Sequence, residues 1–139
     1  MTAFGWAVLT AMMWGVVPLM EKVGLGTSPP AAGVAVRSFG ILAGLLVWSL
    51  ISPPWSAIAS MRIGSILLLA GGGLLASFLG QMVFYQALKL GAISQVTPVA
   101  GAYPLVTALL GWLVLREPLT ASRLLGVVCV VAGLVLLRK

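Results

Sequence analysis

The spacing of the charged residues limits what this chain can fold into, because long stretches between them carry no charge at all. The 139 residues include eight Lys or Arg and two Asp or Glu. Charge-free stretches cover residues 1–20, 38–61, 63–88 and 90–115. An apolar run of about 18 residues is long enough to cross the hydrocarbon core of a bilayer as a helix. The spacing therefore predicts several transmembrane helices joined by short polar segments.

Turn-forming residues between these stretches divide the chain into an all-α integral membrane protein with five transmembrane helices. We predict these helices over residues 3–22, 31–51, 63–88, 93–115 and 120–137. The second requires Arg37 inside the span, and the fifth requires Arg123 to extend its side chain to the interface. Thr120 is a suitable N-cap for the fifth helix. The loops are too short for a soluble domain, so residues 1–139 are predicted to form a single transmembrane domain.

Composition excludes several classes of protein. Apolar residues make up 61% of the chain and charged residues 7%, with a mean hydropathy of +1.18, whereas an ordinary soluble domain has about 25% charged residues. A soluble enzyme, a disordered chain and a disulfide-rich module are therefore excluded. With no histidine or aspartate and only Cys129 as a thiol, the sequence predicts no catalysis, no metal site and no cofactor. The net charge of +6 comes from scattered cations, which are typical of membrane flanks and predict no nucleic-acid binding.

The cations are divided almost equally between the two faces that five helices would create. Arg62, Arg116 and Arg123 share the face of the N-terminus, and the other face has Lys22, Lys89, Arg138 and Lys139. The positive-inside rule needs an excess on one face to fix an orientation. Either a weak bias or a partner chain sets the orientation, or the chain inserts both ways and pairs as an antiparallel homodimer.

Glu21 and Arg37 are the charged residues of most interest within the membrane. Counted from a hairpin apex near Ser28, the two reach similar depths on neighbouring antiparallel helices, so they are candidates for an ion pair. An Arg near a helix centre costs roughly 2.5–3.5 kcal/mol on insertion scales, and it normally faces a partner or a wet cavity. In the alternative, Arg37 extends to the interface and Glu21 lies among headgroups. Two roles are open at this point: Glu21 is the candidate proton or cation carrier, or Arg37 instead attracts an anionic substrate.

The third predicted helix carries a polar stripe. Ser77, Gln81 and Tyr85 follow at i, i+4 and i+8, so they share one face. Small residues at the same spacing allow close contact with another helix: Gly72, Ala76 and Gly80. The stripe either lines a substrate path or only joins helices.

The fourth predicted helix is interrupted by Pro98 and Pro104, with Gly101 between them. Within a membrane, such an interruption is tolerated where the segment is buried in protein or lines a cavity. Thr97 and Tyr103 lie beside it and become candidates for the wall of a substrate path. In the alternative, the prolines only shape helix packing.

Trp14 and three residues of the last predicted helix complete the set of candidate positions. Trp14 lies at mid-depth although Trp prefers the interface, so it either stacks on a substrate or packs in the core. Gly126, Cys129 and Gly133 form a face suited to a dimer contact. The predicted substrate path therefore consists of Trp14, Glu21, Arg37, Gln81, Tyr85, Thr97 and Tyr103.

Several strings, taken in order, resemble one five-helix unit of the drug/metabolite transporter superfamily in its EamA-like branch. They are AMMWG at 11–15, EKVGLG at 21–26, PPAAGVAVR at 29–37, FYQALKLGAIS at 84–94, PVAGAYPLVTALLGWLVLREPLT at 98–120 and RLLGVVCVVAGLVLL at 123–137. Typical members have two such units fused into ten helices. The resemblance therefore implies that this chain is one half of such a fold, working as a homodimer or as a heterodimer with a similar short chain.

The resemblance also implies a function. It suggests a multi-pass protein of the plasma (inner) membrane that exports or exchanges small organic solutes by alternating access. A related four-helix family, the small multidrug resistance proteins, works as an antiparallel dimer with a Glu inside its first helix, whereas Glu21 lies nearer the end of the span. The alternatives are a non-transporting membrane subunit and a partner in flipping a lipid-linked substrate.

Overall fold

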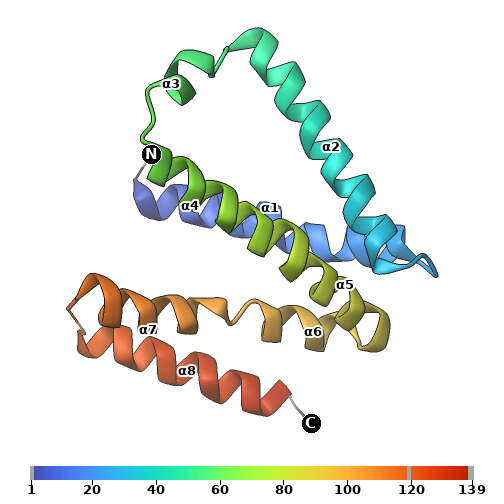
Figure 1. Ribbon diagram of the computed structural model, residues 1–139. Helices are drawn as coiled ribbons and strands as arrows, with labels where there is room; N and C mark the ends of the chain where they lie inside the picture. The colour runs from blue at the N-terminus through green and yellow to red at the C-terminus, as the bar shows by residue number, and fades with distance from the viewer. Residues whose placement is uncertain (1, 119, 138–139) are drawn as a thin grey trace. The chain divides into compact units, whose positions relative to one another are not determined.

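The computed structural model describes residues 2–118 and 120–137, and over this part of the chain it contains helices and no strand (Figure 1). The elements in chain order are α1 (Ala3–Leu25), α2 (Pro30–Ile51), α3 (Trp55–Ala59), α4 (Ile63–Gly73), the π-helical segment η1 (Leu74–Gly80), α5 (Gln81–Leu90), α6 (Ile93–Ala100), α7 (Tyr103–Leu115) and α8 (Ala121–Leu137). The predicted all-α class is therefore confirmed for the described residues.

Four helical stretches are long and apolar enough to cross a membrane. They are Ala3–Leu25, Pro30–Ile51, Ile63–Leu90 and Ile93–Leu115. The fifth predicted span is an apolar helix, α8, of 17 residues, which is slightly shorter than the roughly 20 residues that a transmembrane helix needs. The fifth span and the half of a ten-helix fold therefore stay predictions. The terminal cations Arg138 and Lys139 lie outside the described residues.

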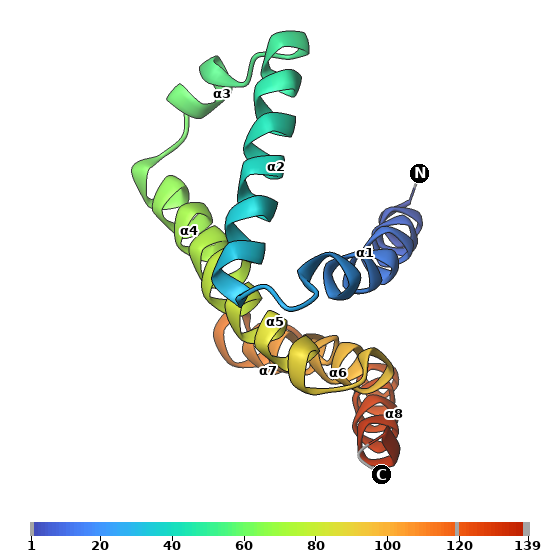
Figure 2. The ribbon, with the colours of Figure 1, turned by 90° about the vertical axis from the view of Figure 1, so that its right-hand side faces the viewer.

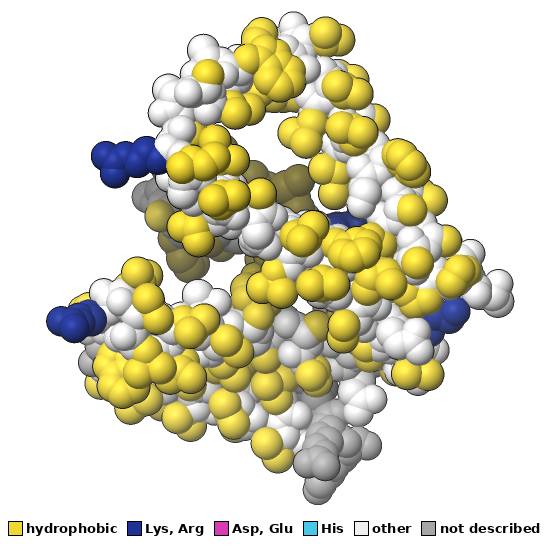
Figure 3. Space-filling view, viewed as in Figure 1, with side chains coloured by type: hydrophobic (Ala, Val, Ile, Leu, Met, Phe, Trp, Pro, Cys, Tyr) yellow, Lys and Arg dark blue, Asp and Glu magenta, His cyan; other side chains and the backbone are white. Residues whose placement is uncertain are grey.

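The chain divides into two compact units, Met1–Lys89 and Leu90–Lys139. Within the described residues, buried positions occur only in the first unit: Pro18, Leu25, Val34, Tyr85 and Leu88. Most large apolar side chains are exposed instead, and Figure 3 shows them covering most of the visible helix surfaces. This pattern is expected of helices surrounded by lipid, because lipid tails are as apolar as the side chains. The single domain predicted over 1–139 stays a prediction.

The connection between α1 and α2 brings these helices together beside α5 in both ribbon views (Figures 1 and 2). Helix α1 continues to Leu25, three residues beyond its predicted end, and stops where Gly26 adopts φ 48°. Glycine reaches this backbone region without a Cβ clash, which makes it the usual helix terminator. Pro30 then begins α2, at a first-turn position where its missing N–H costs nothing.

The third span is helical along its whole length, but its middle is not α-helical. Seven residues, Leu74–Gly80, adopt the wider π-helical conformation between α4 and α5. The sequence predicted one uninterrupted helix over 63–88. Because π-helical bonds join residues five apart instead of four, this segment changes which face of α5 points in a given direction.

The fourth span is broken at the predicted place. Helix α6 ends at Ala100 and α7 begins at Tyr103, with Pro104 in its first turn. A proline ring clashes with the carbonyl four residues earlier, which for Pro104 is that of Ala100. Gly101 still donates its N–H to the Thr97 carbonyl at 2.7 Å, so the break leaves that backbone group paired.

Two details of the connecting segments add to the prediction. Helix α3 occupies a segment that the sequence analysis treated as loop, directly after Pro53 and Pro54. Thr120 caps α8 as predicted, since its hydroxyl accepts the Arg123 N–H at 3.4 Å.

Candidate functional site

Glu21 is the centre of a polar cluster between three helices of the first unit. Its side chain is 10% exposed, and its Oε1 lies 3.3 Å from Nε of Arg37. Glu21 comes from the last turns of α1 and Arg37 from the second turn of α2. The ion pair predicted from equal depth is therefore present. Pairing the two charges offsets much of the desolvation penalty that either charge would have alone.

Two side chains of α5 bind the same carboxylate oxygen. Gln81 Nε2 donates to Glu21 Oε1 at 2.9 Å, and the Tyr85 hydroxyl donates at 3.1 Å. The two lie one helical turn apart, so both reach one point on α1. Oε1 thus accepts two hydrogen bonds and lies in an ion pair with Arg37. Nη1 of Arg37 is buried without a hydrogen-bond partner in the described structure.

A cavity of about 380 Å³ lies beside this cluster. Its lining is mostly apolar and consists of Val17, Met20, Glu21, Gly24, Leu25, Ser28, Ala32, Gly33, Val36, Arg37 and Tyr85. Small-molecule sites commonly combine such an apolar wall with a few polar groups that fix the ligand's orientation. The geometry therefore suits a small solute with one polar or charged group.

Gly33 lets the three helices approach closely, and this role was not predicted from the sequence. A Cβ at this position would lie 2.7 Å from Cε2 of Tyr85 and 2.7 Å from Cδ1 of Leu25. Any larger residue would therefore displace the ring that binds Glu21. A signal was available: Gly33 precedes Arg37 by four residues, so the two share a face of α2.

Two lysines donate hydrogen bonds to backbone carbonyls at the end of the cluster near the α1–α2 connection. Lys22 Nζ donates to the Leu88 carbonyl at 2.6 Å. Lys89 Nζ donates to the carbonyls of Thr27 and Ser28 at 3.2 and 3.0 Å. From the sequence, these lysines were predicted only as charges on one membrane face. Their bonds tie α5 to α1 and to the loop after it.

The remaining predicted path residues are not part of this cluster. Trp14 is 60% exposed and does not line the cavity, although it lies two turns before Glu21 on α1. Thr97 and Tyr103 belong to the second unit. There the Thr97 hydroxyl is buried without a hydrogen-bond partner in the described structure, and Tyr103 is 55% exposed.

The predicted dimer contact on α8 has open space around it. A Cβ on Gly126 or Gly133 would meet no heavy atom within 4 Å, and Cys129 is exposed. Small residues at an unoccupied helix surface permit close approach of another helix.

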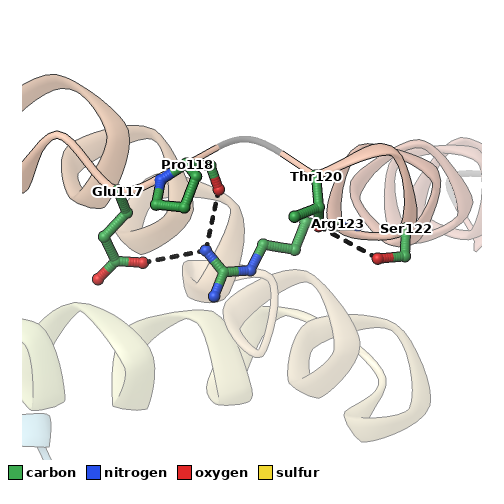
Figure 4. Close-up of polar contacts among 5 residues, drawn as sticks. All are labelled: Glu117, Pro118, Thr120, Ser122 and Arg123. Atoms are coloured by element: carbon green, nitrogen blue, oxygen red, sulfur yellow. Dashed lines mark hydrogen bonds and ion pairs between the residues drawn. The ribbon is translucent and has the colours of Figure 1, made fainter.

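A second set of polar contacts lies at the connection between α7 and α8 (Figure 4). Arg123 Nη1 lies 3.3 Å from Oε2 of Glu117 and donates to the Pro118 carbonyl at 3.1 Å, while Thr120 and Ser122 share a hydrogen bond of 3.1 Å. The ion pair is more than half exposed on both sides. Exposed pairs contribute about 0–1 kcal/mol, so this one chiefly orients the turn.

Comparison with known proteins agrees with the membrane helices. The EamA-like transporter family model matches residues 1–139. An uncharacterized protein of Methanocaldococcus jannaschii is 26% identical over 140 residues, covering 98% of this chain and 96% of that protein. A protein of Sinorhizobium sp described as an uncharacterized transporter in the cobO 3′ region is 28% identical over 132 residues, covering 95% and 93%. No solved structure matches significantly. The chain is thus a multi-pass membrane protein that belongs to the EamA-like transporter family.

Proposed function

We propose that this protein is a secondary transporter of small organic solutes of the drug/metabolite type, which it exports or exchanges across the plasma (inner) membrane. The observation that carries the proposal is the partly buried Glu21–Arg37 pair beside a cavity of about 380 Å³. Ionisable residues inside a membrane are costly, and they mark substrate and ion pathways. A family of membrane transporters supplies the matching context.

The transporter works as a dimer by alternating access. The nearly equal division of cations between the two predicted faces favours two copies in opposite orientations. The open α8 face with Gly126, Cys129 and Gly133 offers the contact. The relatives in Methanocaldococcus jannaschii and Sinorhizobium are of nearly the same length as this chain, which suits pairing either with itself or with a similar short chain.

The proposed set of path residues also includes predicted positions outside the cluster. Trp14 continues the Glu21 face of α1, and Thr97 and Tyr103 supply polar groups beside the broken span. Glu21 acts as the coupling carboxylate, because Gln81 and Tyr85 hold it in place whichever partner Arg37 takes.

Reconstituted transport tests the proposal. Purified protein is placed in liposomes with an imposed proton gradient, and uptake of always-charged organic probes, a phenylalkyl sulfonate and a phenylalkyl trimethylammonium, is measured. We expect gradient-driven uptake of at least one probe, and Glu21→Gln should abolish it. The matched control is Glu117→Gln, which removes an exposed carboxylate and should retain uptake. Uptake that survives Glu21→Gln would remove Glu21 from the mechanism, and no movement of any probe would favour a non-transporting subunit or a flippase partner.

A further inference from the structure

Given the transport function proposed above, we propose that the cavity of the first unit selects small organic anions with an apolar body. In this proposal the anionic group of the solute binds Arg37 and replaces Glu21 as its partner.

Arg37 has hydrogen-bonding capacity that the protein itself does not use. Its Nε faces Glu21, while Nη1 is buried without a partner in the described structure. A buried donor left unpaired is costly, and an incoming acceptor removes that cost. The guanidinium is also suited to a planar anion, because its fork can bind two oxygens at once. The side chain is 33% exposed and lines the cavity, so a solute can reach it.

Glu21 keeps hydrogen-bond donors when Arg37 turns away from it. Gln81 and Tyr85 donate to the same Oε1 that forms the ion pair with Arg37. When Arg37 turns to a solute, these two neutral donors stay on the carboxylate. In this exchange, Arg37 replaces one charge-assisted contact with another. Glu21 keeps its two hydrogen bonds from α5.

The same arrangement disfavours organic cations. Among the described residues of the first unit, one acid, Glu21, stands against four cations, Lys22, Arg37, Arg62 and Lys89, which leaves an excess of three positive charges. A cation at the carboxylate would compete with the two donors Gln81 and Tyr85 and would lie next to the Arg37 guanidinium. Two neighbouring positive charges repel each other, and they do so more strongly where water is excluded.

The remaining lining of the cavity indicates that the rest of the solute is apolar. Apart from the ionic pair, Ser28 and the Tyr85 hydroxyl, its wall is built of aliphatic side chains and glycines. An apolar body of the size of a phenylalkyl group fits a volume of about 380 Å³ and gains free energy by leaving water. The site thus matches an amphiphilic monoanion.

Equilibrium binding with three matched probes tests this inference separately from transport. The probes are phenylpropionate, phenylpropionamide and phenylpropylammonium, which share one apolar body and differ in charge. With wild-type protein in lipid nanodiscs, we expect phenylpropionate to bind at least about 10-fold more tightly than the amide, as a charge-assisted hydrogen bond implies. The ammonium should bind most weakly. Equal affinities, a preference for the ammonium or no binding of phenylpropionate would overturn the inference.

Two variants should shift anion binding in opposite directions. Arg37→Gln should remove the preference of the site for phenylpropionate over the amide. Glu21→Gln should strengthen phenylpropionate binding several-fold, because the competitor for Arg37 is gone. Arg62→Gln is the matched control, since Arg62 lies at the start of α4 and does not line the cavity. It removes the same charge and should keep the preference.

The outcomes separate the two proposals. If Arg37→Gln misfolds, Arg37→Lys keeps the charge and should retain part of the preference, because the forked contact is lost. A preference that Arg37→Lys leaves at full strength, or that Arg62→Gln removes, would contradict the role of Arg37. Anion-selective binding without uptake in liposomes would refute the transporter but not the anion site. Uptake of the trimethylammonium probe, without any anion preference, would refute the anion site alone.

Discussion

At the scale of single residues, one carboxylate oxygen organises the first unit. Oε1 of Glu21 joins α1 to Arg37 of α2 and to Gln81 and Tyr85 of α5. These contacts come from two further helices, α2 and α5, so the oxygen acts as a cross-link between three helices. Hydrogen bonds to a charged group contribute about 1.5–3 kcal/mol each, more than neutral ones.

Gly33 gives the sharpest test of this packing. Gly33→Ala places a Cβ 2.7 Å from the Tyr85 ring, so the ring must move and its bond to Glu21 must lengthen. We expect a loss of roughly 1–3 kcal/mol in stability and weaker binding of phenylpropionate, measured by thermal unfolding and by titration in nanodiscs.

Gly44→Ala is the control for Gly33→Ala, because it lies on the same helix with no heavy atom within 4 Å of the added methyl. It should be neutral or stabilise α2 by up to about 1 kcal/mol, since alanine favours helix over glycine. If both variants behaved alike, Gly33 would have no packing role.

The residue scale also shows what could be read from the chain. The Glu21–Arg37 pair was predictable because depth in a membrane depends on distance along the chain, and distances from a hairpin apex can be counted. The convergence of Gln81 and Tyr85 on one oxygen of Glu21 was not. It depends on the rotation of α5 about its axis, and η1 changes that rotation by an amount that the spacing of polar residues does not reveal.

At the scale of elements, η1 determines which face of α5 meets Glu21. One residue of register corresponds to about 100° around an α-helix. If Leu74–Gly80 adopted α-helical bonds, Gln81 and Tyr85 would turn away from the cluster. The π-helical segment is therefore a place where a local change of hydrogen bonding is able to dismantle the site.

Gly80 is the position at which to test the π-helical segment. A Cβ at Gly80 would lie 3.0 Å from the Leu75 carbonyl oxygen, so Gly80→Ala should disfavour the π form. We expect uptake of the anionic probe to fall about 10-fold or more, since misplacement by a small distance is costly at a binding site. Gly72→Ala, with open space around the added methyl, should leave uptake unchanged. Equal uptake by the two variants would show that the π form is not required.

The elements of the fourth span were more predictable than those of the third. Pro98 and Pro104 act through fixed backbone geometry, so the break near Gly101 followed from the sequence. The π-helical segment has no comparable residue signal, because Leu, Ala, Ser and Phe all fit α-helices too. Helix α3 was missed for a similar reason, as five residues are too few to show a period.

At the scale of the whole molecule, the proposed dimer has a direct test in Cys129. This cysteine is exposed and lies at the middle of α8, so two copies that meet along α8 bring it to the same depth in either relative orientation. Mild oxidation in membranes should yield a disulfide-linked dimer, detected by non-reducing electrophoresis, and Cys129→Ser should prevent it. No cross-link at Cys129 would place the contact elsewhere.

A second cysteine distinguishes the two orientations. In a Cys129→Ser background, a cysteine is placed at Ala121, the first residue of α8. With α8 as the predicted fifth span, this position lies at one face of the membrane. Antiparallel copies hold two such cysteines on opposite faces and should not cross-link, whereas parallel copies should. Efficient cross-linking through Ala121→Cys would contradict the antiparallel arrangement.

The scarcity of buried side chains has a consequence for handling the protein. With five buried positions in the described residues, few side-chain contacts hold the helices to one another. The lateral pressure of the surrounding acyl chains must therefore keep them together. Detergent micelles exert less lateral pressure than a bilayer does. Stripping away the surrounding lipid should therefore loosen α1, α2 and α5 before it unwinds any one of them, and the Glu21–Arg37 ion pair at their junction would be the first feature to hydrate.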